Sequence, residues 1–287
     1  MGIKRKSKLW SQVGAMALMG GLAACGGEMG EGGSEHGQPV DDQTALSSHA
    51  GEGEGESGAE GENESGGGGE FGIDPELARQ DPVVYLSALE VIRAHYLAGI
   101  GALEDGGRSA AAEMFAHPIS EIYVDLEEVV IALGAENFLD LMSDASAAPF
   151  DGRSDEEVGA AVTRVLNAIN AAETFAPATE ESEASVYAKV MAGLIHRAVL
   201  QYQFAAAEPR AVEAYLDGFG FERAASDIAG RQMPAIRMEN AALADALEAA
   251  LAALAEVYPT AVRPEAFDGD VDGLFAASDA ITAVIKP

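Results

Sequence analysis

Residues 81–107, DPVVYLSALEVIRAHYLAGIGALEDGG, decide the fold because they form one long helix with two apolar faces. Asp81 can cap this helix, Pro82 suits its first position and Gly106 can follow its last turn. One face is a stripe of large apolar side chains, and the other is built from smaller ones such as Ala88, Ala98 and Gly99. Because a helix that is apolar on both sides is buried by its neighbours, we expect it at the centre of a helical bundle.

The remainder of residues 74–287 also has the composition of helices. Ala, Leu and Glu abound, and no stretch alternates polar and apolar residues with β-branched side chains. We expect further helices at 109–133 (interrupted at His117-Pro118), 137–147, 154–174, 183–207, 209–230, 234–258 and 272–285. The prediction is an all-α domain, an antiparallel bundle of about eight helices joined by short loops.

Residues 1–25 have the pattern of a secretory signal: a basic start, a short apolar run and small residues before Cys25. A transmembrane helix is the alternative, but it needs about 20 apolar residues, and only sixteen residues, Ser11 and Gln12 among them, lie between Lys8 and Cys25. Leu22-Ala23-Ala24-Cys25 resembles the signal of bacterial lipoproteins, which implies cleavage before Cys25 and lipid attachment to it. Gly26, where some lipoproteins have Asp, implies transport to the outer membrane. We therefore expect a lipid-anchored protein of the cell envelope that faces the periplasm or the cell surface.

Residues 26–73 have the composition of a disordered linker. Gly, Glu and Ser dominate, and the segment holds twelve acids and no Lys or Arg. Such a chain buries too little apolar surface to fold and behaves as an expanded coil. We expect it to tether residues 74–287 to the membrane, with His36 and His49 as weak metal ligands because no geometry fixes them.

The charge balance excludes one class of partner. Residues 74–287 contain thirteen Lys or Arg against thirty-six Asp or Glu. Nucleic acid binds basic patches, so we expect no nucleic-acid partner. The acidic balance suits a cation or a basic protein partner, although solubility alone also explains it.

The segment His117–Glu128 carries the most suggestive pattern in the chain. On a regular helix His117, Glu121, Asp125 and Glu128 lie within about 80° of arc. An imidazole and a carboxylate four residues apart can share a metal ion. The alternative is a solvated face, because an apolar stripe lies nearly opposite the acids. Burial of the acids by another helix would favour the site.

The pair His117 and Glu121 resembles the His-x-x-Glu signature of the imelysin-like proteins, which are helical envelope proteins linked to iron acquisition. The spacing here is one residue longer, and Ala116 stands where the signature has glycine. The resemblance implies metal binding through His117 and Glu121.

Two further histidines could complete a site. His95 lies on the small-residue face of the helix at 81–107, where it could either be satisfied by a backbone carbonyl or bind a metal. His196 lies opposite the apolar stripe of its helix and could be a surface residue. If the helices converge, His95, His117 and Glu121, with His196 as a fourth member, form one metal site.

Glu213 and Asp217 form a second pair of carboxylates four residues apart, and Gly218 and Gly220 follow them. The glycines could break the helix and open a site, or they could let another helix approach closely.

No recognisable catalytic motif is present. The sequence lacks a Gly-x-Ser-x-Gly elbow, a Walker-type phosphate loop and His-Glu-x-x-His. We therefore expect no enzyme, and predict an envelope protein that binds iron or another divalent metal for uptake or buffering. The alternative is a non-catalytic module that presents an acidic helical surface to an envelope protein, and a hydrolase of imelysin type comes third.

Overall fold

The computed structural model describes residues 74–285, and throughout that range the ordered elements are helices, with no strand. The all-α prediction is confirmed. The expected signal, the lipid attachment at Cys25 and the expected linker at 26–73 lie outside the described residues. The elements are α1 Pro75–Ala78, α2 Pro82–Glu104, α3 Arg108–Pro118, η1 Ile119–Tyr123, α4 Val124–Leu133, α5 Leu139–Ala147, α6 Asp155–Glu173, α7 Glu183–Ala207, α8 Val212–Glu239, α9 Ala241–Val257 and α10 Val271–Val284.

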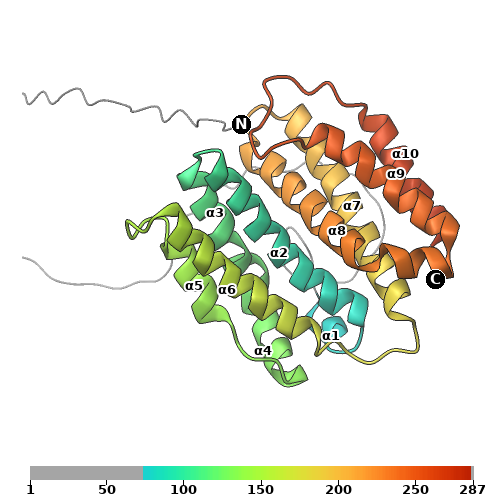
Figure 1. Ribbon diagram of the computed structural model, residues 1–287, viewed down its shortest axis with the longest axis horizontal. Helices are drawn as coiled ribbons and strands as arrows, with labels where there is room; N and C mark the ends of the chain where they lie inside the picture. Colours follow the sequence, from blue (N-terminus) through green and yellow to red (C-terminus); the bar gives the residue numbers. More distant parts are fainter. Residues whose placement is uncertain (1–73, 286–287) are drawn as a thin grey trace, which may run out of the picture. The chain divides into compact units, whose positions relative to one another are not determined.

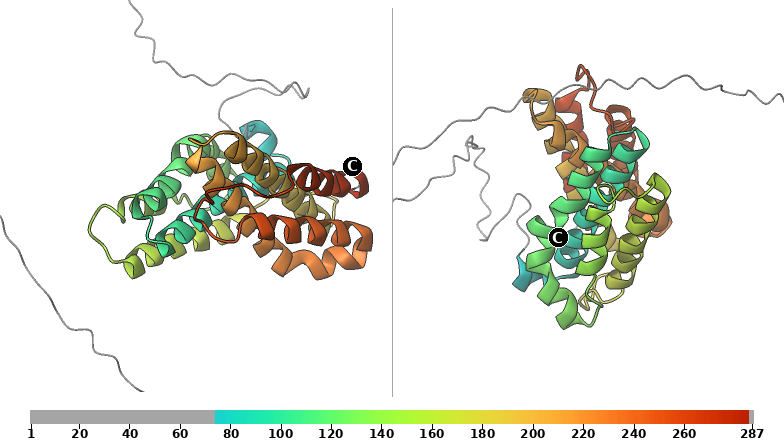
Figure 2. Two further views of the ribbon diagram at one scale, coloured as in Figure 1. Left: turned by 90° about the horizontal axis from the view of Figure 1, so that it is seen from above. Right: turned by 90° about the vertical axis from the view of Figure 1, so that its left-hand side faces the viewer.

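The helices form two groups, and α2 belongs to both (Figure 1). In the first group α2, α3, α5 and α6 pack in a ring, and in the second α7, α8, α9 and α10 do the same. Helix α2 also packs against α7 and α8. Figure 2 shows the two groups side by side when the bundle is seen from above.

Helix α2 is the centre of the bundle, as its two apolar faces predict. The side chain of Asp81 accepts a hydrogen bond of 2.7 Å from the Val83 amide, and Pro82 occupies the first turn. Among the described residues, α2 is the one helix long and apolar enough to cross a membrane, and 72% of its most apolar window is buried inside the bundle. The same length and composition are expected of a core helix.

The helix expected at 109–133 continues through its proline. Pro118 has no N–H to donate to the preceding turn, and a π-helical turn, η1, follows it directly before α4 resumes a regular helix. His117 therefore lies at the end of α3 and Glu121 lies within η1. Because the π-helical turn of η1 is wider than an α-helical turn, the side chains of α4 do not share a helix face with His117 as they would on one regular helix.

The expected break between 230 and 234 is wrong, because α8 runs without interruption from Val212 to Glu239. Pro234 removes the donor that would bond the Gly230 carbonyl, and Gly230 is exposed, so water can satisfy that carbonyl. The break occurs at Asn240, whose backbone is extended and whose side chain caps α9 by accepting from the Leu243 amide.

The two glycines of α8 serve close packing. A Cβ atom at Gly220 would lie 2.3 Å from the Ala94 carbonyl oxygen of α2, and one at Gly218 would lie 1.8 Å from the Tyr258 hydroxyl. The helix does not break there, so the close-approach interpretation of Gly218 and Gly220 is confirmed. Asp217 is thereby held next to α2.

Candidate functional site

Three of the four predicted ligands lie together. His95 of α2, His117 of α3 and Glu121 of η1 each offer one ligand atom, and these atoms lie within 4.8 Å of one another. The rings of His95 and His117 meet edge to face, with centroids 6.4 Å apart. The convergence depends on the packing of α3 and η1 against α2.

His95 is presented in the form that binds metals. Its side chain is 2% exposed, and its Nδ1 lies 2.8 Å from the Val91 carbonyl oxygen. Because a carbonyl only accepts, Nδ1 carries the proton. Burial lowers the pKa of His95 to about 4, so the ring is neutral at pH 7. The lone pair therefore resides on Nε2, and the Val91 carbonyl fixes the orientation of the ring, as outer-shell carbonyls do for metal ligands.

Two carboxylates from different helices face Nε2 of His95. Glu121 Oε2 lies 3.9 Å away and Asp217 Oδ1 lies 3.7 Å away. Both distances exceed the usual range of an N–H···O hydrogen bond. Ligand atoms around a tetrahedral zinc ion with bonds of about 2.1 Å are about 3.4 Å apart. Small side-chain movements would therefore let Nε2 share an ion with Glu121 or with Asp217.

Asp217 extends the site beyond the predicted set. It lies on α8, with its side chain 12% exposed, and it reaches His95 because Gly220 lets α8 approach α2. The sequence placed Asp217 next to two glycines but did not connect it with His95. The candidate site therefore contains two imidazoles and two carboxylates, contributed by both groups of helices.

The acidic stripe predicted at 117–128 is divided by η1. Glu121 faces the site with its side chain 32% exposed, whereas Asp125 and Glu128 are exposed on α4. Glu128 lies 3.8 Å from the guanidinium of Arg79. The site and solvated-face interpretations thus each describe part of the stripe. Of His95 and Glu121, Glu121 is the more exposed, since the His95 side chain is 2% exposed.

His196 lies elsewhere. It is exposed on α7, its Nδ1 is 3.3 Å from the Ser278 hydroxyl of α10, and its ring meets that of Phe275. The structure does not bring it into the group formed by His95, His117 and Glu121.

A second polar cluster was not predicted from the sequence. Glu90 of α2 is fully buried, and it pairs with Arg93 at 2.9 Å and with Arg231 of α8 at 3.3 Å. Glu173 of α6 binds Arg93, Arg231 and the Tyr187 hydroxyl. We call Glu90, Arg93, Glu173 and Arg231 the inter-helix ion cluster. Its members join α2, α6 and α8.

The pKa values of the two carboxyls of the inter-helix ion cluster are shifted in opposite directions. Burial raises the pKa of Glu90 to about 8, and Glu90 is hydrogen-bonded to Glu173. Burial also acts to raise the pKa of Glu173, but Arg93, the Glu90 hydrogen bond and Arg231 together hold it below its ordinary value. These opposite shifts favour a proton on Glu90 over one on Glu173.

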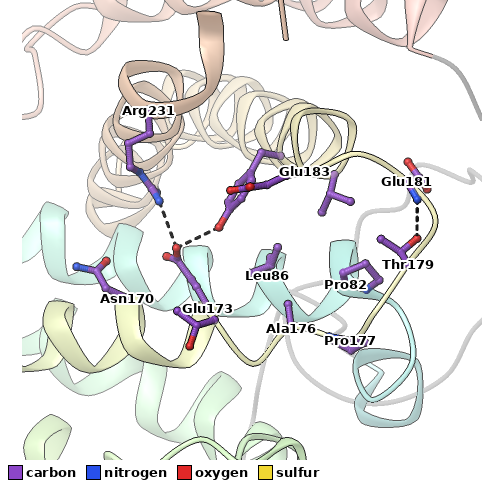
Figure 3. Close-up of a pocket in the computed structure, with 13 residues that line it drawn as sticks. Pro82, Leu86, Asn170, Glu173, Ala176, Pro177, Thr179, Glu181, Glu183 and Arg231 are labelled. Carbon is purple, nitrogen blue, oxygen red and sulfur yellow. Dashed lines mark hydrogen bonds and ion pairs between the residues drawn. The ribbon is translucent and has the colours of Figure 1, made fainter. Parts of the chain in front are cut away.

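Two pockets adjoin this cluster. Figure 3 shows the first, of about 470 Å³, in which the Glu173 carboxylate is held by Arg231 and a tyrosine. The second, of about 890 Å³, lies between α6 and α8 on the other side of the Glu173–Arg231 pair. Neither is lined by the His95 group.

Comparisons with known proteins add no identification. No protein-family model, no curated protein and no solved structure matches this chain.

Proposed function

We propose that this protein captures a divalent transition-metal ion at His95, His117, Glu121 and Asp217. The observation that carries the proposal is the neutral, oriented imidazole of His95, with two carboxylates 3.7 and 3.9 Å from its Nε2. A cation bound there would bond the lone pair together with Glu121 or with Asp217. Metal sites in helical bundles are built in this way from side chains on facing helices.

The ligand types favour iron, zinc and related ions over magnesium and calcium. Imidazole suits zinc, copper, iron and nickel, whereas magnesium and calcium prefer sites made only of oxygen. Two imidazoles and two carboxylates give a mixed nitrogen and oxygen set, and this site has no thiolate. The partly exposed Glu121 would meet an ion from solvent before the buried His95 does.

Uptake or buffering is the role we propose for the captured ion. The resemblance of His117 and Glu121 to the imelysin-like pair supports metal handling in the envelope. The lipid anchor expected at Cys25 and the acidic linker expected at 26–73 belong to the same proposal, because together they would hold the site near a membrane.

The test is metal-dependent thermal melting of the full-length chain, stripped of metal. A ligand that binds only the folded state stabilises it by about 2.7 kcal/mol at 100 times its Kd. For a domain of this size that corresponds to roughly 5–10 °C in Tm. We expect this shift with micromolar Fe²⁺ or Zn²⁺ and none with Mg²⁺ or Ca²⁺ at the same concentration.

Matched variants locate the binding. His117→Ala, Glu121→Gln and Asp217→Asn should each reduce the shift, whereas His196→Ala should leave it unchanged, since His196 lies against α10. Equal shifts in His117→Ala and His196→Ala would place metal binding outside the proposed site. No shift with Fe²⁺, Zn²⁺, Cu²⁺ or Mn²⁺ would end the proposal.

A second candidate function rests on the outer face of α4. Val124 and Ile131, seven residues apart, are 59% and 51% exposed, and the exposed Glu128 lies between them. Apolar side chains beside an acid suit the docking of an envelope protein with a basic, apolar surface. Under this function, Val124→Ser with Ile131→Ser would abolish cross-linking to the partner and leave metal binding intact.

A further inference from the structure

The pocket between α6 and α8 has the size and lining of a small-molecule site. Residues of α2, α6 and α8 line it. In Figure 1, α2 lies between α6 and α8. Its volume of about 890 Å³ lies within the range of about 300–1,000 Å³ that is typical of ligand pockets. We call it the α6–α8 pocket.

The α6–α8 pocket combines an apolar surface with arginines. Leu97 and Ile100 of α2, Leu166 of α6 and Phe219 of α8 supply the apolar lining. Arg93, Arg223 and Arg231 line the same pocket. Three acids, Glu104, Glu173 and Asp227, line it as well, so the formal charges balance and an anion would need the arginine that these acids engage least.

Arg223 is the arginine best placed to hold a ligand. Its side chain is 37% exposed, and its guanidinium stacks over the Phe219 ring at 4.7 Å. Its contacts with the Tyr258 and Pro259 carbonyls, at 3.3 and 3.5 Å, are long. Its acidic neighbour is Glu222, 3.0 Å away, and burial raises the pKa of that carboxyl. Arg231, by contrast, pairs with three acids.

The neighbouring acids limit the charge that a ligand can carry. Glu104 lines the pocket near the end of α2, and Asp227 lines it between Arg223 and Arg231 on α8. A head group with two negative charges would be repelled by both. A single negative charge can pair with Arg223, because guanidinium binds carboxylate in a bidentate manner.

We propose that the α6–α8 pocket binds a small organic monoanion with an apolar body, of the class of medium-chain carboxylates. Arg223 pairs with the carboxylate head, and the body lies against Leu97, Ile100, Leu166 and Phe219. This site is separate from the metal site, and it does not depend on the metal proposal.

The experiment is calorimetric titration of the full-length chain with decanoate, below its micelle concentration and in the presence of EDTA. Decanol and decyltrimethylammonium, which have the same tail with a neutral and a cationic head, are titrated in parallel. We expect decanoate to bind at least tenfold more tightly than either, because hydrogen bonds to charged groups are stronger than neutral ones.

Variants test the assignment of the residues. Arg223→Gln should weaken decanoate binding about tenfold or more, and Leu166→Asn should weaken decanoate and decanol alike. Arg164→Gln is the matched control, because Arg164 is an exposed arginine of α6 that pairs with Asp144 and does not line the pocket. His117→Ala should leave decanoate binding unchanged.

Three results would overturn the proposal. They are the absence of decanoate binding, equal affinity for the three probes, and equal affinity of Arg223→Gln and Arg164→Gln for decanoate. Loss of binding in His117→Ala would place the carboxylate at the metal-site residues instead. EDTA is present throughout, so decanoate binding is measured without bound metal. The result for the α6–α8 pocket therefore does not depend on whether the metal site exists.

Discussion

Replacing Gly220 with alanine should disturb the candidate metal site through the packing of two helices. The new Cβ atom would lie 2.3 Å from the Ala94 carbonyl oxygen and 3.1 Å from the Ala98 side chain. An ordinary carbon–oxygen contact is about 3.3–3.6 Å, so α8 must move about 1 Å away from α2. Asp217, three residues earlier on α8, would move with it and away from His95.

The magnitude follows from two opposing effects. Overpacking a well-filled interior costs about 1–3 kcal/mol, and we take the upper part of this range, about 2–3 kcal/mol, because the contact here is with backbone, which cannot rotate away. Alanine in place of a helical glycine recovers about 1 kcal/mol. We expect a net loss of about 1–2 kcal/mol, which lowers Tm by roughly 2–8 °C for a domain of this size. The larger Asp217–His95 separation should also reduce the metal-induced shift.

Gly230→Ala is the matched control, because Gly230 lies on the same helix and a Cβ atom added there would have no neighbour within 4 Å. It should raise Tm by roughly 2–4 °C and leave the metal-induced shift unchanged. Thermal melting with and without Zn²⁺ measures both quantities for both variants. If Gly220→Ala is as stable as Gly230→Ala and binds Zn²⁺ as the native chain does, the close crossing does not hold Asp217 in place and the reasoning is wrong.

Three other substitutions have definite expected outcomes, and the first two concern the dependence of stability on pH. Glu90 has a folded-state pKa of about 8 against an ordinary 4.5, so the folded chain holds an extra proton between these pH values and its free energy of unfolding falls as pH rises through that window. Glu90→Gln removes this loss, and its Tm relative to the native chain should increase from pH 6 to pH 9. A difference independent of pH would contradict the raised pKa of Glu90. For His95 the folded pKa of about 4 lies below the ordinary 6.5, so the free energy of unfolding should fall as pH falls from 6.5 toward 4. This part of the acid destabilisation should disappear in His95→Gln. Ser154→Ala removes the capping box of α6, in which Ser154 and Glu157 bond each other's backbone, and should cost about 1 kcal/mol in urea unfolding without any effect on metal binding.

Periodicity and end signals predicted most of the helices. Asp81-Pro82 and Ser154 with Glu157 begin α2 and α6 as expected, because these signals act within one turn of the chain. Pro234 was misleading, since a proline inside an exposed stretch of helix removes only one hydrogen bond and the packing of α8 outweighs that loss. The π-helical turn after Pro118 also had no signal beyond the proline itself.

The candidate site was only partly predictable, for a different reason. The spacing of His117 and Glu121 is local and was visible, but the approach of His95 and Asp217 depends on which helices cross and where. Gly220 was the available clue to that crossing. The inter-helix ion cluster was missed because Glu90 and Arg93 lie in a largely apolar segment. Two charged residues in such a segment are expected on the exposed side of the helix, and the sequence does not show that they are buried against α6 and α8.

Glu90 and Arg93 also make α2 less compatible with a lipid bilayer. The helix spans Pro82–Glu104, so Arg93 stands at its midpoint, the depth at which a charged side chain is least compatible with hydrocarbon. An arginine or acidic residue at the centre of an inserted helix costs about 2.5–3.5 kcal/mol on a translocon scale. In the bundle the same two side chains find partners on α6 and α8. The charges that tie the two helix groups together therefore also oppose the retention of α2 in a lipid bilayer before its neighbours have been synthesised.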